Sequence, residues 1–207
     1  MLLPPHLSRR PAMPRLCRHG RPVHQRPWLL AGAAKGEVRK MRPTLFIFSG
    51  LPASGKTTLS RLLAKSKRAV YLRIDTVEQA LRSFSIEVQE EGYSLCYRIA
   101  LDNLRLGLNV VADSCNPIEL TRRAWESVAR NANADFVNIE IICSDKSEHK
   151  KRAVTRVTDI DGLRPPSWAE IENREYHEWQ RERTVIDTAE RTEKECFEIL
   201  VRAMAGR

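Results

Sequence analysis

The sequence predicts an α/β fold: a five-stranded parallel sheet sandwiched by helices, with a helical lid. Three observations lead to this prediction. Strand-like and helical segments alternate from residue 43 onward, a glycine-rich motif joins the first strand to the first helix, and an aspartate follows three of the strands. Such alternation places parallel strands side by side and covers both faces of the sheet with helices.

The predicted strands are short apolar segments rich in β-branched and aromatic residues, which favour extended chain. They occupy residues 43–49, 69–74, 109–112, 136–143 and 184–186. The first helix follows the glycine-rich motif and runs to about residue 65. Further helices are expected at 76–83, 92–106, 117–130, 147–158, 167–182 and 193–204.

Apolar stripes and capping residues support these helices. In 92–106 an apolar stripe lies along one face and Gly107 ends the helix, while 193–204 carries a second stripe. Asn116 is expected to cap a helix whose first residue is Pro117. Ser167, with a glutamate three positions later, has the spacing of a capping box.

The glycine-rich motif has the pattern G-x-x-x-x-G-K-T, the phosphate-binding P-loop. Its glycines let the backbone turn its N–H groups toward a phosphate, its lysine reaches the terminal phosphates, and its threonine hydroxyl can hold Mg²⁺. The strand before it and the helix after it are the setting that the motif requires. The predicted nucleotide-binding residues are Gly50, Leu51, Pro52, Ala53, Ser54, Gly55, Lys56, Thr57 and the following Thr58.

The charge of the chain is concentrated at its beginning. Residues 1–40 hold seven arginines and two lysines against one acid, whereas the whole chain has 35 basic and 26 acidic residues. The rest of the chain is therefore nearly neutral, which argues against nucleic acid as a partner. The apolar run 28–34 is too short to span a bilayer, so no membrane association is expected.

Residues 1–42, rich in proline and arginine, are interpreted as a disordered basic tail ahead of a domain at 43–207. A targeting peptide fits the arginines but not the prolines, and a true translation start at Met41 is the third possibility. The five cysteines form no C-x-x-C pair, which argues against a zinc site or a disulfide framework. A reducing, cytoplasmic location is expected.

Three aspartates end predicted strands, at the edge of the sheet where ligands of such folds bind. Asp113 follows a buried strand and is expected to hold Mg²⁺ together with Thr57. Asp75 faces the place of an acceptor hydroxyl, whose proton it could accept. Spacing alone assigns no role to Asp187. For each aspartate, a cap or turn after a strand is the alternative interpretation.

Phosphoryl transfer also needs positive charge over the transferred group. Arg152 and Arg156 lie four residues apart and are expected on one face of a helix, followed by an irregular flap at 158–166. We interpret residues 148–166 as a closing lid, with an ordinary solvated basic face as the alternative.

Several segments together resemble the small P-loop kinases: GLPASGKTT, VVADSCNP, KRAVTR, PPSW and VIDTA. The most similar group consists of predicted ATP-dependent kinases often labelled AAA-family ATPases, related to gluconate kinases and to the kinase domain of polynucleotide kinases. The resemblance covers about residues 43–204. It implies a nucleoside-kinase-like sheet with strand one between strands three and four, bound ATP and Mg²⁺, and a lid.

The resemblance also implies roles for single residues. Asp75 would contact the acceptor, and Arg152 and Arg156 would clamp the phosphates or stack on adenine. The loop that carries Asp187, Thr188 and Ala189 would lie along the base.

One position departs from the family pattern, because relatives often have an arginine three residues after the acceptor aspartate. Here that position is Glu78, which argues against an anionic acceptor and weakly favours a neutral or cationic one. The alternatives are that Glu78 faces solvent or that Arg82, one turn on, substitutes for the missing cation.

The main functional prediction is a kinase that moves the γ-phosphate of ATP to a hydroxyl of a small molecule. A polynucleotide 5′-hydroxyl kinase and a nucleotide-dependent switch ATPase without acceptor are the alternatives. The lack of an N-K-x-D base-recognition motif argues against a GTPase switch. The acceptor pocket is expected near residues 84–93, and Cys115 is expected to be a buried thiol.

Overall fold

The computed structural model describes residues 42–205, so the predicted tail at 1–42 lies outside the described residues except for its last position. All five predicted strands are present and form one parallel sheet in the order β2-β3-β1-β4-β5. This order confirms the predicted place of strand one between strands three and four. The strands are β1 (Thr44–Ser49), β2 (Val70–Arg73), β3 (Val110–Asp113), β4 (Asp135–Ile142) and β5 (Thr184–Asp187).

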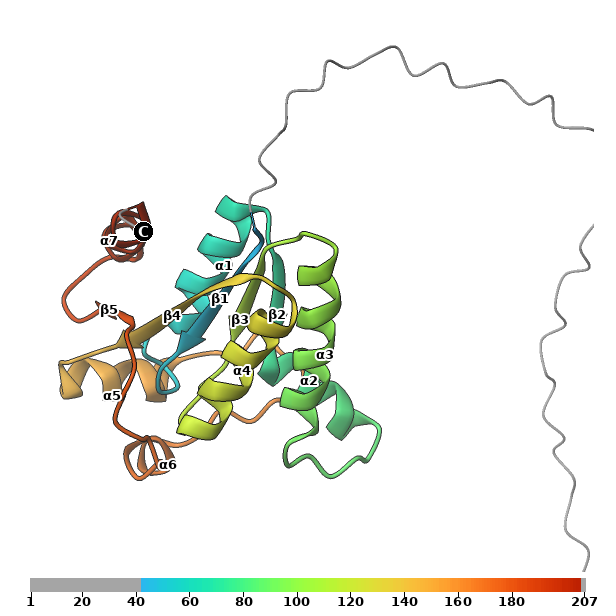
Figure 1. Ribbon diagram of the computed structural model, residues 1–207. Helices are drawn as coiled ribbons and strands as arrows, with labels where there is room; N and C mark the ends of the chain where they lie inside the picture. Colours follow the sequence, from blue (N-terminus) through green and yellow to red (C-terminus); the bar gives the residue numbers. More distant parts are fainter. Residues whose placement is uncertain (1–41, 206–207) are drawn as a thin grey trace, which may run out of the picture. The chain divides into compact units, whose positions relative to one another are not determined.

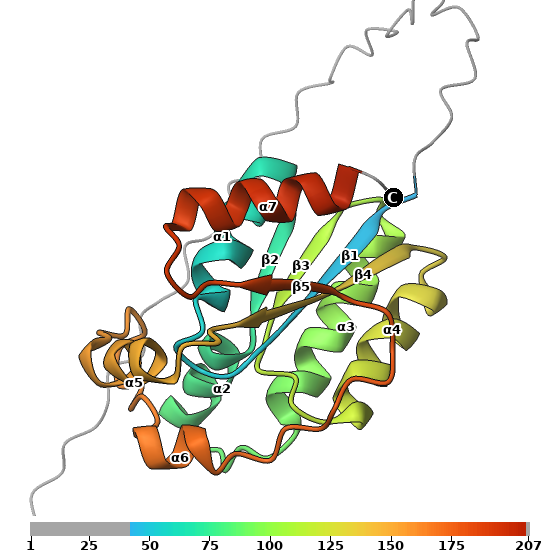
Figure 2. The same cartoon turned by 90° about the vertical axis from the view of Figure 1, so that its left-hand side faces the viewer.

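Helices cover both faces of the sheet, with α1 and α7 on one side and α3 and α4 on the other (Figures 1 and 2). The helices are α1 (Lys56–Lys67), α2 (Ile74–Ser83), α3 (Glu91–Arg105), α4 (Glu119–Asn131), α5 (Lys146–Thr155), α6 (Trp168–Glu172) and α7 (Glu193–Ala205). None of the helices within residues 42–205 is long and apolar enough to cross a bilayer.

The central strand β1 is buried on both faces, and its alternate residues belong to two separate cores. Leu45 and Ile47 pack with α3 and α4, whereas Phe46 and Phe48 pack with α1 and α7. This double burial explains why β1 is a continuous apolar run in the sequence. It also holds the loop after β1 on a rigid base.

The largest difference from the sequence prediction is the helix expected at 167–182. The capping box at Ser167 is confirmed, but α6 ends at Glu172 and an irregular segment follows. Tertiary contacts outweigh helix propensity there. The buried Arg122 guanidinium stacks on the Trp179 ring at 4.0 Å, and Arg181 pairs with the buried Glu126. The segment is thus fixed across α4 by side-chain contacts that a helix would not present.

Three smaller corrections concern the edges of elements near the site. Helix α4 begins at Glu119, and Asn116 does not cap it but adopts a left-handed backbone with φ of 49°. Helix α5 ends at Thr155, so Arg156 lies just beyond the helix rather than on one of its faces. Strand β2 ends at Arg73, which places Asp75 in the first turn of α2 instead of at the strand end.

Candidate functional site

The backbone of the P-loop adopts a tight bend that depends on its glycines. Gly50 has a φ of 141°, and a Cβ there would come within 2.2 Å of the Ile141 carbonyl oxygen on β4. Ala53 and Gly55 also adopt positive φ, at 66° and 93°. The Gly50 amide donates to the Cys115 carbonyl at 3.1 Å, which ties the loop to the end of β3. Gly50 is therefore required by close approach and not only by turn propensity.

The helix after the loop begins with free amides. Gly55 is the N-cap of α1 and provides no side-chain cap, and the first turn of α1 has no acidic residue. The amides of a helix N-terminus attract anions because they are unsatisfied and because the helix dipole is positive there. The loop and the helix start together form a cradle suited to phosphate.

Lys56 lies in this cradle, and its charge is paired with that of Asp113 at the end of β3. Its Nζ donates to Asp113 Oδ1 at 2.9 Å, and Tyr71 donates its hydroxyl to Asp113 Oδ2 at 2.6 Å. Burial opposes the charge on Lys56, but the carboxylates of Asp113 and Asp75 leave its pKa above the usual value. Burial alone would raise the pKa of Asp113, but Lys56 and Tyr71 hold it below its usual range. Both groups are thus charged at neutral pH.

The donors around Thr57 fit Mg²⁺. Thr57 follows Lys56 at the start of α1, and a hydrogen bond from its side chain helps to lower the pKa of the buried Asp113 carboxylate. Within residues 42–205 no cluster of three or more His, Cys, Asp or Glu side chains is arranged to hold a metal. Mg²⁺ rarely needs such a cage, because it keeps several waters and binds one or two protein oxygens together with substrate phosphates. Thr57 and Asp113 supply that kind of donor set.

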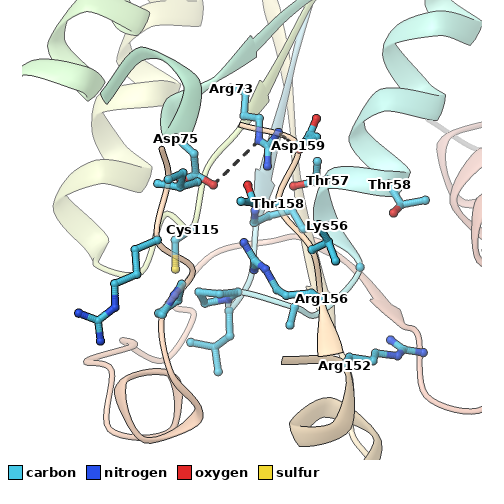
Figure 3. Close-up of a pocket in the computed structure, with 18 of the residues that line it drawn as sticks. Lys56, Thr57, Thr58, Arg73, Asp75, Cys115, Arg152, Arg156, Thr158 and Asp159 are labelled. Atoms are coloured by element: carbon cyan, nitrogen blue, oxygen red, sulfur yellow. Dashed lines mark hydrogen bonds and ion pairs between the residues drawn. The ribbon is translucent and has the colours of Figure 1, made fainter. Parts of the chain in front are cut away.

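A cavity of about 360 Å³ opens over the P-loop (Figure 3). It brings together most of the predicted site residues, from the P-loop, from the start of α2 and from the segment around the end of α5. Gly50, Ser54, Asp113, Asp187 and Thr188 are not part of its lining. Those that line it are Leu51, Pro52, Ala53, Gly55, Lys56, Thr57, Thr58, Asp75, Arg152 and Arg156.

A second cavity, of about 240 Å³, shares Ala53, Gly55, Thr58 and Arg152 with the first. Thr188, which follows β5, lines it together with Arg191 and Cys196. The two cavities therefore adjoin at the P-loop and at Arg152. A nucleotide whose phosphates occupied the first would have room for its base in the second.

Helix α5 is anchored to the P-loop and to the loop after β5. His149 Nε2 donates to the Pro52 carbonyl at 2.8 Å, and Arg152 Nη1 donates to the Thr188 hydroxyl at 2.7 Å. Thr188 in turn donates to the Ser54 carbonyl at 2.9 Å. Arg152 and Thr188 thus link three segments that are far apart in the sequence. His149 was not singled out in the sequence, because one histidine on a charged helix gives no signal of its own.

Arg156 lies beyond the end of α5 and still lines the first cavity. No ion pair or side-chain hydrogen bond involves its guanidinium within residues 42–205. Its charge therefore faces the cavity without a fixed protein partner, in contrast to that of Arg152.

Four further arginines that line the cavity were missed in the sequence, namely Arg61, Arg73, Arg164 and Arg174. Asp159, on the loop after α5, forms ion pairs with both Arg61 of α1 and Arg73 at the end of β2. Arg73 comes first among the groups that hold the pKa of Asp159 well below its usual value, and Arg61 second. The available signals were positional: Arg61 follows Thr57 by one helical turn, and Arg73 precedes Asp75 by two residues.

Asp187 and Glu78 both have structural partners. Asp187 accepts hydrogen bonds from the Ser144 amide and hydroxyl at 3.0 and 2.5 Å, so its carboxylate shapes the turn after β4. Glu78 accepts from Arg82 at 3.0 Å and packs against Gly92 of α3. Glu78 does not line the cavity, although its carboxylate interacts electrostatically with Asp75 and Arg174, which do.

A family described as an AAA domain matches residues 45–165, more than half of the chain. No curated protein shows significant similarity to the sequence.

Several solved structures share the fold at low sequence identity. A proposed kinase from Chloroflexus aurantiacus J-10-fl is 18% identical with a TM-score of 0.62, over 80% of this chain and 98% of its own. A gluconokinase from Sinorhizobium meliloti 1021 is 14% identical with a TM-score of 0.56, over 80% and 94%. The APS kinase CysC of Mycobacterium tuberculosis, in complex with AMPPNP and APS, is 17% identical with a TM-score of 0.54, over 80% and 99%.

Proposed function

The chain belongs to this AAA domain family, and we propose that it is an ATP-dependent phosphotransferase that moves the γ-phosphate of ATP to a hydroxyl of a small molecule. The observation that carries this proposal is a single cavity lined both by the phosphate cradle and by a carboxylate. Lys56 and Thr57 line it from the P-loop, and Asp75 lines it from α2. A protein that only bound nucleotide would have no need of Asp75 at that position.

The proposed reaction is a direct transfer. The acceptor hydroxyl gives its proton to the Asp75 carboxylate as its oxygen bonds to the γ-phosphorus, and the bond from that phosphorus to the bridging oxygen breaks, which leaves ADP. ATP supplies the phosphoryl group. Thr57 and Asp113 would hold Mg²⁺, which would offset the charge of the phosphates when bound. Lys56, Arg152 and Arg156 would stabilise the charge on the transferring group.

The named neighbours support the same reaction class without identifying the acceptor. A gluconokinase and an APS kinase share the fold, and the latter was solved with AMPPNP, an ATP analogue. Their acceptors differ, so the fold alone does not select one. For this chain, the base of ATP would occupy the second cavity, which Arg152 and Thr188 line together with Arg191 and Cys196.

The setting of the reaction is proposed from cysteine chemistry. All four cysteines in the described part of the chain are free thiols, namely Cys96, Cys115, Cys143 and Cys196. Free thiols fit the reducing cytoplasm, where ATP and Mg²⁺ are abundant. Burial raises the pKa of Cys115, with Lys56 and Arg174 opposing it, so this thiol is not prepared as a nucleophile.

The proposal is tested by Asp75→Asn. We expect the variant to bind ATP with Mg²⁺ within a few-fold of the wild type, measured by calorimetry. Its transfer to a pool of hydroxylated metabolites should fall by about 10²–10⁴-fold, because the base is lost and the shape is kept. Asp161→Asn, at an exposed position outside the cavity, is the matched control.

The two alternatives give different results in the same experiment. A switch ATPase would hydrolyse ATP at the same rate with and without the metabolites, and Asp75→Asn would leave that rate unchanged. A polynucleotide kinase would label 5′-hydroxyl oligonucleotides, with a rate that falls steeply as salt rises. Either outcome would overturn the small-molecule assignment.

A further inference from the structure

Arg73 is a buried cation at the boundary of the cavity. Its side chain is 7% exposed, it lines the cavity, and it points into it at the level of Asp75 (Figure 3). Strand register explains this place, because Arg73 of β2 is the partner of Asp113 of β3, the residue that holds Lys56. Arg73 therefore lies between the phosphate end of the cavity and the carboxylate proposed to act on the acceptor.

The guanidinium of Arg73 is incompletely satisfied by the protein. Its Nε is buried and has no hydrogen-bond partner, and it forms only a long ion pair with Asp75, at 4.0 Å. Its Nη1 donates to Asp159 at 2.8 Å. A buried donor without an acceptor is costly, because it has lost its hydrogen bonds to water without replacing them. Because Arg73 lines the cavity, an acceptor from outside can supply the missing partner.

The fixed partner of Arg73 is itself a lid residue. The Asp159 side chain is 53% exposed and belongs to the loop after α5, which we interpret from the sequence as part of a lid. Arg61 binds the same carboxylate from the other side. The two arginines therefore form a site for an oxyanion, and the chain fills it with its own carboxylate.

The charge of the whole cavity points in the same direction. Among the described residues that line it, six arginines and Lys56 face two carboxylates, Asp75 and Asp159. Outside the lining, Asp113 pairs with Lys56 and Glu148 pairs with Arg152, so four carboxylates offset the seven cations. ATP with Mg²⁺ carries a net charge of about −2, which uses only part of the surplus of the arginines. The remainder matches a second anion.

We propose that the acceptor carries an acid group, a carboxylate, sulfate or phosphate, besides its reacting hydroxyl, and that Arg73 binds this group with Arg174. Arg174 is exposed and lines the same cavity as Asp75 and Cys115. This inference rests on the proposed function. The acid group replaces Asp159 as the partner of Arg73 and occupies its unused Nε.

The first experiment sorts acceptors by charge. The full-length protein is incubated with ATP, Mg²⁺ and matched sets of hydroxyl compounds: neutral sugars and polyols, amino alcohols, hydroxycarboxylates, and sugar phosphates. Phosphorylated products are measured by mass spectrometry. We expect products from the hydroxycarboxylates or the sugar phosphates, and none from the neutral or cationic sets.

The second experiment tests the assigned arginines with the best acceptor found. Arg73→Gln and Arg174→Gln should each raise the KM for the acceptor by about 10–100-fold, the loss of one hydrogen-bonded charge, with little change in the KM for ATP. Arg73→Lys should recover part of the lost acceptor affinity, because lysine restores the positive charge but not the planar set of donors of a guanidinium. Arg82→Gln is the matched control, because Arg82 pairs with Glu78 and neither residue lines the cavity.

The outcomes separate this inference from the function on which it rests. Turnover of a neutral acceptor, or a fall in kcat without a rise in acceptor KM for both variants, would overturn the acid-group assignment and leave the kinase intact. No product from any set by a protein that binds ATP would contradict the kinase itself. If Arg73→Gln fails to fold, as judged by its thermal melt, the exposed Arg174→Gln still decides between these outcomes.

Discussion

The two ends of the cavity are built differently. At the P-loop end, the buried Asp113 of β3 is bonded to both the buried Lys56 of α1 and the partly buried Tyr71 of β2. At the other end, which the predicted lid at 148–166 forms, the Arg156 side chain has no partner within residues 42–205 and Asp159 is half-exposed. We call this the lid end. The charges at the first end are paired within the protein, whereas the second end exposes charge that a substrate would neutralise.

This difference assigns different tasks to the two ends. A cradle held by the central strands can fix the phosphates of ATP with little loss of freedom on binding. Exposed arginines on a loop can respond to what binds and can stabilise charge after closure. Substitutions at the P-loop end should therefore change stability and function together, and those at the lid end should change function alone.

The largest effect is expected from Lys56→Met. The buried Asp113 carboxylate would lose its cation, which should lower the free energy of unfolding by about 3 kcal/mol and abolish detectable transfer. Denaturant melts and the product assay measure the two losses. Lys67→Met, at the exposed end of the same helix, is the control and should lie within about 0.5 kcal/mol of the wild type. A stable Lys56→Met protein would refute the view that this end is preassembled.

Gly50→Ala should come next. Its Cβ would meet the Ile141 carbonyl oxygen at 2.2 Å, so the loop or β4 has to move, at a cost of about 2–3 kcal/mol and of most ATP affinity. Gly107→Ala is the matched control, since Gly107 also has a positive φ, of 86°, but open space around its Cα. It should cost only about 1 kcal/mol and spare ATP binding. Equal effects would mean that backbone conformation, not close approach, governs Gly50.

At the lid end, Arg156→Ala should separate function from stability. Transfer should fall by about 10²–10³-fold, because charge over the transferring phosphoryl is lost, while the melting temperature stays unchanged. Arg152→Ala should additionally weaken ATP binding, by about tenfold, because the links to Thr188 and Glu148 are broken. A marked loss of stability in Arg156→Ala would remove the contrast between the two ends.

The smallest effect is expected from Asp159→Asn. Hydrogen bonds from Arg73 and Arg61 lower the pKa of Asp159 in the folded state, so its stabilisation is present above the unfolded pKa of about 4 and is lost as pH falls further. Because the group is half-exposed, we expect a difference of less than about 1 kcal/mol at pH 7. Urea unfolding of both proteins from pH 7 to pH 3 should show this difference shrink below about pH 4. A difference that grows with acid would contradict the assigned ion pairs.

The parts of the molecule that could be predicted from sequence are those in which one local pattern suffices. The P-loop motif requires a strand before it and a helix after it, so the apolar run of β1 could be assigned as a strand. The remaining strands could be assigned because strands and helices alternate along the chain. The segment after Glu172 could not be predicted, because Arg122 and Glu126 hold it from another helix. Arg73 and Asp159 were missed for the same reason, since an ion pair between residues 86 positions apart leaves no local mark.

The account is tested most directly by the fate of the γ-phosphate. ATP labelled at that position is given to the wild-type protein and to Asp75→Asn, with Mg²⁺ and the hydroxyl compounds, and the label is followed into organic phosphate and inorganic phosphate. We predict label in an organic product with the wild type and almost none with the variant. Label that appears only as inorganic phosphate, at equal rates in both proteins, would contradict the proposed transfer to a hydroxyl with Asp75 as the base.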